Sequence, residues 1–349
     1  MGNALWRYTK LIFFLCMISS VLGVEMIPKK LKRGSHIRVI APSTSMSIIS
    51  KEVAALARKR LESFGYKISF GEHIKEADEL LSTSIESRIS DLTAAFEDKK
   101  VDAILTVIGG YNSNQLLNYI DFDVIKRNPK IFCGYSDITA LENAILKKTG
   151  LVTYNGPHFS TFGMLKGIDY TIDYFNRCVA RTGAFLIEPV KEWSDDEWYL
   201  DQEKRKFIKG SGFSTIQRGE ADGKIIGGNL STFTLLNGTT FLPDMSNTVL
   251  FLEDDADTNP RIFDRMLQSV LHQKGFDGIR ALVIGRFQNG SNINNKILRK
   301  IISTKKELKD IPIIADVDCG HATPQITFPI GGTCRVISEQ SPRLEIIKH

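Results

Sequence analysis

The sequence lacks the patterns that mark several specialised classes of protein. Its five cysteines show no CxxC spacing, so a zinc cluster is not indicated. It contains no internal repeat and no low-complexity tract. The formal net charge is only +5, and it falls to +3 without the two charges of Arg7 and Lys10, which lie in a segment that we expect to be removed. So small a charge gives no sign of nucleic-acid binding, and the composition is that of an ordinary globular protein.

The cysteines are expected to be buried rather than bonded to one another. Cys16 belongs to the N-terminal segment, and the remaining chain holds Cys133, Cys178, Cys319 and Cys334. Of these, Cys133, Cys319 and Cys334 lie in or beside apolar strand patterns. One disulfide would be compatible with an oxidising compartment, but we expect free thiols in the interior.

Long apolar runs are scarce as well, and a prominent one lies at the N-terminus. Residues 11–22 are mostly apolar, follow a short basic region and precede the small Gly23. The run is short for a membrane span but typical of an export signal, so we expect residues 1–23 to be a signal peptide and the mature chain to begin near Val24. An uncleaved anchor and a lipidated Cys16 are the alternatives. We therefore expect an exported protein, periplasmic or secreted, with no stable membrane insertion after cleavage.

The length of the chain and its alternating pattern predict two domains. With 349 residues it exceeds the size at which one core usually stops growing. Residues 32–166 alternate short apolar strands with helices, which predicts an α/β domain with a parallel sheet covered on both faces, of flavodoxin or Rossmann type. The strands are expected at 37–41, 67–70, 103–108, 131–133 and 152–154, and the helices at 51–64, 85–96, 113–119 and 138–148.

The second half of the chain is less regular at first. Residues 167–209 lose the pattern and hold Trp193 and Trp198 in an acidic, aromatic stretch, which we interpret as a linker and a substrate loop. Residues 210–349 resume the alternation and predict a smaller mixed α/β domain.

The most informative motif is Gly-Tyr-Ser-Asp at 134–137, between an apolar strand and the helix expected from residue 138. A serine at such a corner projects out of the sheet beside a helix N-terminus, which is where a nucleophile belongs. The alternative is that Ser136 and Asp137 only cap the helix.

A serine nucleophile needs a neighbouring base and an acid that orients it. His321 and Glu253 both come at the ends of apolar strands, so their side chains are expected at strand ends. The alternative for His321 is a surface or packing residue. His158 is a rival base, because it too lies near a strand end. The acidic run that begins at Glu253 could instead be a solvated loop, a helix cap or a calcium site, although it lacks the ligand spacing of a dedicated calcium loop.

The turn at Gly109 and Gly110, after a strand and before a helix, is the other half of the predicted site. Glycines there allow a close approach of the backbone and direct N–H groups outward. One of the two, together with the N–H of Asp137, would form an oxyanion hole. The alternatives are a plain tight turn and a phosphate site. The turn lacks both the Gly-x-Gly-x-x-Gly pattern and a Walker lysine, so nucleotide binding is not expected there.

Together these motifs resemble those of the serine LD-carboxypeptidases, a family that includes muramoyl-tetrapeptide carboxypeptidases and microcin C self-immunity peptidases. The similarity runs in order through nearly all of residues 32–347. It is carried by the stretches 41–43, 108–113, 134–139, 227–231, 252–253 and 320–321.

The resemblance implies a catalytic triad of Ser136 as nucleophile, His321 as general base and Glu253 as the group that orients it. It also implies oxyanion donors at the N–H groups of Gly110 and Asp137, a site formed between the two domains, and a homodimer.

Within the family, the glycine turn and the tryptophan segment look closer to the microcin C immunity branch. In that branch a loop tryptophan is associated with stacking on a nucleotide base, a contact worth about 1–3 kcal/mol. Trp193 and Trp198 are the two candidates for this contact, with packing of the linker as the alternative, and Asn229 is a further candidate substrate-binding residue.

We therefore expect a serine peptidase without cofactor or metal that hydrolyses an amide bond next to a free carboxylate. The substrate would be a murein peptide or an aminoacyl nucleotide of the microcin C type, cleaved through an acyl-enzyme. An export signal suits murein or peptide hydrolysis better than the immunity role, because detoxification of an aminoacyl nucleotide is a cytoplasmic task. The alternative is a catalytically silent protein that binds a peptide or nucleotide-like ligand in the same cleft.

Overall fold

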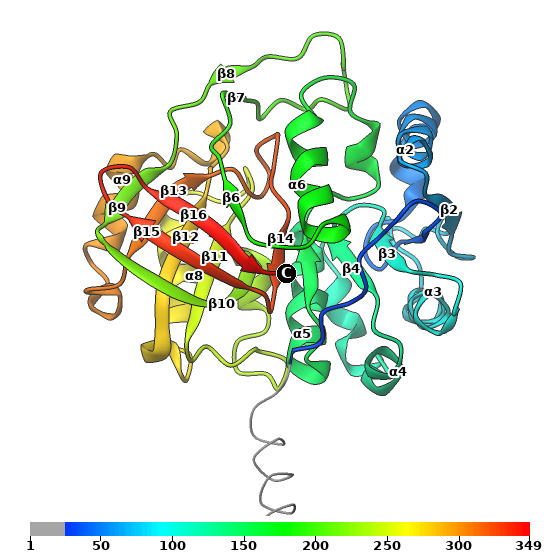
Figure 1. Ribbon diagram of the computed structural model, residues 1–349, viewed down its shortest axis with the longest axis horizontal. Coiled ribbons are helices and arrows are strands. Elements are labelled where there is room, and N and C mark those ends of the chain that lie inside the picture. Colours follow the sequence, from blue (N-terminus) through cyan, green and yellow to red (C-terminus); the bar gives the residue numbers. More distant parts are fainter. Residues whose placement is uncertain (1–24) are drawn as a thin grey trace, which may run out of the picture.

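The computed structural model describes residues 25–349, so the predicted signal peptide at 1–23 lies outside the described residues and stays a prediction. Two β-sheets stand next to each other, each with its own helices, and the C-terminus lies near their junction (Figure 1). Within the described residues, none of the helices combines the length and apolarity that a membrane crossing requires.

The first sheet has six strands in the order β14-β5-β4-β3-β1-β2. Strands β1 to β5 run parallel, in the strand order of flavodoxin-like folds, and β14 pairs antiparallel with β5. The bounds are β1 (His36–Ile40), β2 (Lys67–Phe70), β3 (Ala103–Thr106), β4 (Ile131–Gly134), β5 (Thr153–Asn155) and β14 (Phe328–Ile330). The predicted parallel α/β domain is confirmed.

Helices cover both faces of this sheet because the strands are apolar on both sides. Ile104 and Phe132 pack with one group of helices, whereas their neighbours Leu105 and Cys133 pack with the other. The first group is α3 (Ile85–Glu97), α4 (Phe122–Arg127) and α5 (Thr139–Thr149), and the second is α2 (Lys51–Ser63) and α6 (Asp169–Ala180).

The second sheet has eight strands in the order β6-β16-β15-β10-β11-β12-β13-β9. Its four central strands β10 to β13 are parallel and the flanking strands are antiparallel, so the sheet is mixed as predicted. The strand bounds are β6 (Phe185–Ile187), β9 (Ser214–Gln217), β10 (Gly219–Asn229), β11 (Thr248–Glu253), β12 (Ile279–Gly285), β13 (Ile313–Val317), β15 (Thr333–Ser338) and β16 (Arg343–Lys348), and the helices are α7 (Leu230–Thr234), α8 (Pro260–Leu271) and α9 (Asn295–Ile302).

The structure corrects the predicted domain boundaries in two places. The presumed linker 167–209 contains α6, which covers the first sheet, and β6, which extends the second. The C-terminal segment returns to the first sheet through β14. The second sheet has eight strands and the first has six.

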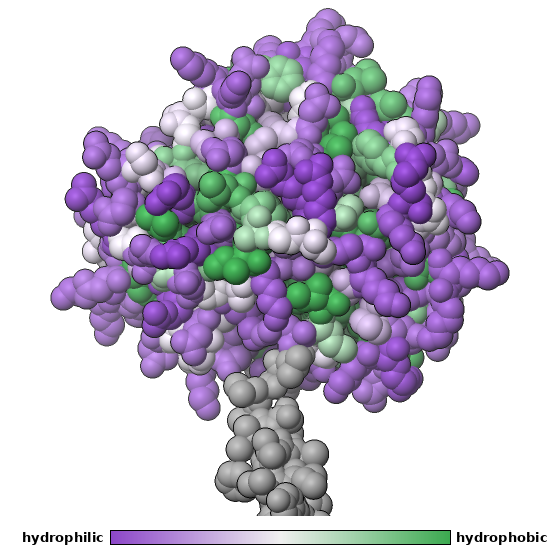
Figure 2. Space-filling view, in the orientation of Figure 1, coloured by the Kyte–Doolittle hydropathy of each residue, from purple (hydrophilic) through white to green (hydrophobic). Residues whose placement is uncertain are grey.

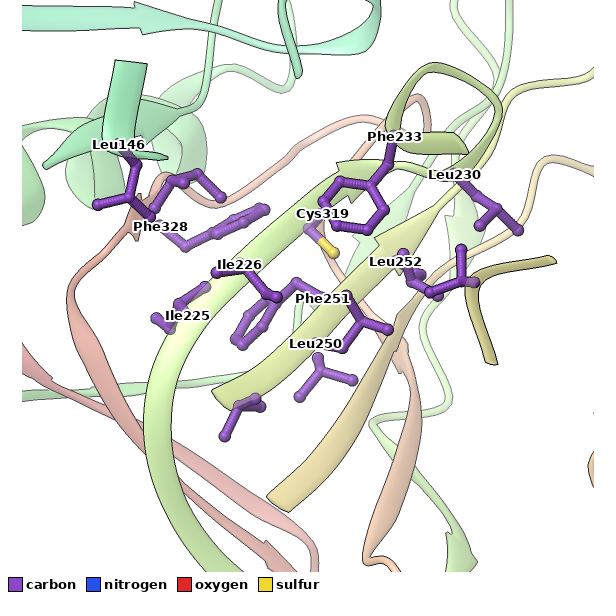
Figure 3. Packing of buried hydrophobic residues seen from close by; sticks show 14 of the residues in the cluster. Leu146, Ile225, Ile226, Leu230, Phe233, Leu250, Phe251, Leu252, Cys319 and Phe328 are labelled. Carbon is purple, nitrogen blue, oxygen red and sulfur yellow. The ribbon is translucent and has the colours of Figure 1, made fainter. Parts of the chain in front are cut away.

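The two sheets share one hydrophobic core (Figure 3). Phe328 of β14 stacks on Phe251 of β11, with ring centroids 4.7 Å apart, and Leu146 of α5 belongs to the same buried cluster. Polar contacts reinforce this packing: Asn143 of α5 donates to the carbonyl of Gly227 and accepts from its N–H. Helix α5 follows the predicted nucleophile directly, so this contact fixes that corner against the second sheet.

On the face shown in Figure 2, hydrophobic residues are scattered among hydrophilic ones rather than gathered into one broad patch. The four cysteines of the described part are all buried and free, which confirms the prediction of interior thiols.

Candidate active site

Ser136 lies at a sharp corner between β4 and the 3-10 turn Ser136–Ile138 that leads into α5. Its φ is +60°, a left-handed conformation that costs a residue other than glycine about 1–3 kcal/mol. Neither the turn nor α5 begins with a side-chain capping hydrogen bond. The helix-cap alternative is therefore not what the structure shows, and the strained corner instead presents the serine hydroxyl at the carboxyl end of the sheet.

His321 and Glu253 reach this hydroxyl from the second sheet. Glu253 ends β11, and His321 follows β13 by four residues. His321 Nε2 lies 3.0 Å from Ser136 Oγ, and His321 Nδ1 lies 2.8 Å from Glu253 Oε2. The Glu253 side chain is 2% exposed, so its carboxylate is held in a largely water-free position. The structure thus brings the three predicted residues into one hydrogen-bonded row.

A glycine beside the histidine makes this row possible. Gly320 has a φ of +92°, and a Cβ at this position would collide with Oε2 of Glu253. A larger residue would therefore displace the carboxylate from the imidazole.

The surroundings of His321 shift its pKa upward. Burial acts to lower the pKa, but the negative charge of Glu253, its hydrogen bond to the ring, and the charges of Asp255 and Asp254 outweigh burial and raise the pKa to about 8. The carboxylate thus stabilises the imidazolium form, the state that a base at this position reaches after it takes a proton.

His158, the rival base, occupies a different position. It is buried, and its Nδ1 lies 2.8 Å from Thr106 Oγ1. Burial, reinforced by the charge of His321, lowers the pKa of His158 to about 3, so the ring is neutral. It stacks on Tyr135 at 4.3 Å between ring centroids, and the same tyrosine meets the ring of His321 at 5.2 Å. His158 therefore packs against Tyr135. His321 is the histidine at hydrogen-bond distance from Ser136.

The glycine turn and Asp137 are joined by a buried hydrogen-bond network. Asp137 Oδ2 accepts from Ser43 Oγ at 2.6 Å and from the N–H of Ser113 at 2.8 Å. Gly110 has a φ of +152°, and a Cβ there would collide with the hydroxyls of Ser43 and Thr44. The Asp137 side chain thus holds the loop that carries Gly110 close to the nucleophile corner.

A cavity of about 380 Å³ opens beside Ser136. Gly110, Asp137 and Asn229 all contribute to its wall. Asn229 is buried at the end of β10, where its Oδ1 caps α7 and its Nδ2 donates to Asp254 Oδ1 at 3.2 Å. The structure therefore places Asn229 both at the cavity and in a structural role.

The two tryptophans differ in exposure, and neither lines this cavity. Trp193 is 8% exposed and packs under the guanidinium of Arg286, 5.3 Å from its ring centroid. Trp198 is partly exposed next to Tyr199. Their hairpin, formed by β7 (Glu192–Trp193) and β8 (Ile208–Lys209), is attached beside the His321 segment through backbone hydrogen bonds between Ser194 and Thr323.

The acidic turn after β11 is partly buried. Burial and the neighbouring Glu253 raise the pKa of Asp254 to about 6, against hydrogen bonds from Ser231 and Thr258 that act to lower it. Across residues 25–349, no three His, Cys, Asp or Glu side chains are grouped so that they could hold a metal ion.

Two residues at the site were missed by the sequence reasoning. Tyr135 lies inside the recognised motif and contacts both histidines, and Tyr111 follows the glycine turn and donates to Asp257 Oδ2 at 3.2 Å across the cavity mouth. Their position next to Ser136 and Gly110 in the sequence was the available signal.

A serine at a strained strand-to-helix corner, facing a histidine and a buried glutamate, defines the arrangement of a serine-type hydrolase. Comparison with known families agrees. The model for the LD-carboxypeptidase N-terminal domain matches residues 37–156, and that for the LD-carboxypeptidase C-terminal domain matches residues 222–336. The chain belongs to the LD-carboxypeptidase family, which consists of serine-type carboxypeptidases.

Individual relatives cover almost the whole chain. The protein named "Putative carboxypeptidase YocD" from Bacillus subtilis (strain 168) is 54% identical over 93% of this chain and 100% of its own length. A solved MccF-like protein from Bacillus anthracis str. Ames has a TM-score of 0.92 at 51% identity, covering 93% of this chain and 100% of that chain. MccF in complex with glutamyl sulfamoyl guanosine has a TM-score of 0.82 at 27% identity, covering 92% and 98%. These similarities support the microcin C immunity-like branch.

Proposed function

We propose that this protein is a carboxypeptidase that cleaves an amide bond next to a free carboxylate through an acyl-enzyme on Ser136. The single observation that carries the proposal is the row of contacts from Ser136 Oγ to His321 Nε2 at 3.0 Å and from His321 Nδ1 to Glu253 Oε2 at 2.8 Å. In this row His321 is the general base, and Glu253 fixes its tautomer and balances its charge.

The first half of the reaction forms the acyl-enzyme. His321 Nε2 takes the hydroxyl proton of Ser136 while Oγ bonds to the substrate carbonyl carbon. The N–H groups of Gly110 and Asp137 stabilise the oxyanion that develops. His321 then gives its proton to the leaving nitrogen, and the C–N bond breaks. The group that departs is the amine with its free carboxylate when the substrate is a peptide, and the nucleotide part when the substrate is an aminoacyl nucleotide.

The second half regenerates the enzyme. His321 removes a proton from a water molecule, whose oxygen attacks the ester carbonyl. The bond to Ser136 Oγ breaks, and His321 returns the proton to the serine. Neither half requires a cofactor in this scheme.

The proposed substrate is a small peptide of the murein type or an aminoacyl nucleotide. Support comes from the cavity beside Ser136, which is of a size that suits small ligands, and from related MccF structures that contain glutamyl sulfamoyl guanosine and aspartyl sulfamoyl adenosine. The predicted homodimer and export remain predictions.

The direct test is incubation with a peptide that ends in D-alanine and with an aminoacyl sulfamoyl adenosine, followed by mass spectrometry. We expect release of free D-alanine or of the free amino acid. If both compounds remain intact, the proposal is wrong.

The pH dependence of turnover is expected to report His321. The base must be neutral to act, and its pKa is about 8, so only about a tenth of the enzyme is in the active form at pH 7. The value of kcat/KM should therefore rise with pH and level off above pH 8. An activity that is flat between pH 6 and pH 9, measured under kcat/KM conditions, would contradict this assignment.

Gly110→Ala should lower kcat by about 10²- to 10³-fold, because the added Cβ collides with Ser43 and Thr44 and moves one oxyanion donor. Gly212→Ala is the matched control, since Gly212 also has a positive φ but a Cβ there meets nothing within 4 Å. Steady-state kinetics of both variants test this, and equal effects would show that the loss reflects backbone strain rather than the oxyanion hole.

A further inference from the structure

A carboxyl group lies buried behind the nucleophile corner, and the proposed reaction does not use it. Glu142 belongs to the first turn of α5, the helix that follows Ser136, and its side chain is 0% exposed. Burial of an ionisable side chain costs free energy, because the charged form loses its hydration. A carboxyl group kept at this position is therefore a candidate for a role in the site.

The carboxyl of Glu142 faces the ends of two neighbouring strands. Its Oε2 accepts from Nδ2 of Asn155, the last residue of β5, at 2.9 Å. The backbone N–H of Gly134, the last residue of β4, is the other hydrogen-bond donor that acts on this carboxyl. Gly134 and Asn155 are themselves partners in the sheet. One side chain thus connects α5 to both strands at the edge that carries Ser136.

Gly134 is fixed from its other sides as well. Its carbonyl accepts from the N–H of Gly156 at 2.7 Å, and a Cβ on Gly134 would collide with Oγ1 of Thr106. Ser136 follows two residues later with its strained φ of +60°. Such a conformation persists only where the surrounding structure over-determines it. The contacts of Gly134 are part of that surrounding structure, and Glu142 supplies the contact from the helix.

The amide of Asn155 also borders the second sheet. Asn155 is 2% exposed, and its Nδ2 would lie 3.0 Å from a Cβ on Gly228 in β10. The sheet that contains β10 also contains the strands that lead to Glu253 and His321. A shift of Asn155 would therefore change how the Ser136 corner faces this sheet.

The carboxyl of Glu142 is mostly uncharged at neutral pH. Burial raises its pKa to about 8, against the amide of Asn155 and the N–H of Gly134, which act to lower it. No cation of the described part of the chain is among the groups that shift this pKa. An uncharged carboxyl has an accepting oxygen and a hydroxyl, so the amide of a glutamine has the same shape and can accept the same hydrogen bonds.

We propose that Glu142 is a positioning residue of the active site, whose uncharged carboxyl holds the ends of β4 and β5 against α5 and so keeps the Ser136 hydroxyl in line with His321. The proposal rests on the proposed function, because it assigns Glu142 a part in the reaction of Ser136. Glu142 is buried and does not line the cavity beside Ser136. Its effect is therefore expected on the chemical step and not on substrate binding.

The test measures how fast a fluorophosphonate labels Ser136, by intact-protein mass spectrometry. Glu142→Met removes the hydrogen-bonding oxygens and fills a similar volume, and it should slow labelling by about 10²-fold, the cost of a displacement of about 1 Å at a reacting centre. Glu142→Gln should stay within about threefold of the wild type, because it keeps the accepting oxygen. With a peptide substrate, Glu142→Met should lower kcat by a similar factor and change KM by less than about twofold.

A second variant reaches the same contact from the other side. Asn155→Ala removes the amide that donates to Glu142 and leaves the carboxyl in place. It should slow labelling by about tenfold, because the contact with Gly134 remains. This variant also decides the matter if Glu142→Met does not fold.

Lys130→Met is the matched control. Lys130 is 7% exposed and immediately precedes β4, so it lies at the opposite end of the strand that leads to Ser136. Its ammonium donates to the carbonyls of Ala95 and Asp98. The substitution leaves buried partners unpaired, as Glu142→Met does, but away from the site, so the labelling rate should not change. Thermal unfolding followed by circular dichroism shows whether each variant is folded.

The outcomes separate this proposal from the proposed function. Labelling of Glu142→Met at the wild-type rate would overturn the proposal, and so would unchanged labelling of Asn155→Ala. Glu142→Gln as slow as Glu142→Met, or Lys130→Met as slow as Glu142→Met, would overturn it too, because the loss would then not depend on the uncharged hydrogen-bonding group at this corner. A wild-type protein that is labelled on Ser136 but hydrolyses no substrate would contradict the proposed function alone.

Discussion

Ser136→Ala is expected to lower kcat by about 10⁴-fold or more while the protein stays folded. The substitution removes the atom that bonds to the substrate, and the oxyanion donors and binding groups that remain supply only a small part of the rate enhancement. Peptide hydrolysis by the purified variant, followed by mass spectrometry, measures the effect.

The matched control is Ser303→Ala, at an exposed serine that follows α9. It should leave kcat unchanged. Circular dichroism of both variants should match the wild type, because alanine at position 136 keeps the backbone and loses only the hydroxyl. Turnover within tenfold of the wild type in Ser136→Ala would show that another group is the nucleophile.

Glu253→Gln is expected to lower kcat by about 10³- to 10⁴-fold. The amide keeps the shape of the side chain, but it no longer balances the imidazolium charge, and it can present an N–H toward His321 and favour the wrong tautomer. The loss of the carboxylate also removes the main influence that raises the pKa of His321. The alkaline rise of kcat/KM should therefore move to lower pH in this variant.

Glu339→Gln is the control for this experiment. Glu339 is exposed and follows Ser338, which pairs with Gly219 at the amino end of β10, so it lies away from the carboxyl ends that carry the site. Its kinetics and pH profile should equal those of the wild type. A Glu253→Gln enzyme with a reduced rate but an unshifted pH profile would assign Glu253 a purely structural role.

The sequence allowed the nucleophile corner to be predicted because the information there is local. An apolar strand, a sharp turn and a helix follow one another around Ser136, and the structure shows each of them. The choice between His321 and His158 is not local, since both follow strands. It depends on how the second sheet packs against the first, which brings His321 to Ser136 and leaves His158 beneath Tyr135.

Among the elements that escaped prediction, helix α6 and strand β14 did so for different reasons. Helix α6 has buried residues at helical spacing, from Thr171 through Tyr174 and Phe175 to Cys178 and Val179, so its signal was present within a stretch interpreted as linker. Strand β14 gave little signal because it has three residues and contains a proline, which is tolerated only because the strand lies at the edge of the sheet.

The substrate-binding residues depended most on the three-dimensional structure. Asn229 and the acidic turn meet at one cavity only after the two sheets are packed. Conversely, the burial of Trp193 under Arg286 could not be foreseen from a stretch without periodicity. Charge and aromatic content in a sequence show which residues can bind a ligand, whereas packing decides which of them face it.

The central claim is that Ser136 is a nucleophile activated by His321, and covalent labelling tests it most directly. Treatment with a fluorophosphonate, followed by intact-protein mass spectrometry and peptide mapping, should show one adduct on Ser136 in the wild type. The adduct should be absent from Ser136→Ala and form far more slowly in His321→Ala. Labelling of a different residue, or the same labelling in Ser136→Ala, would contradict the account.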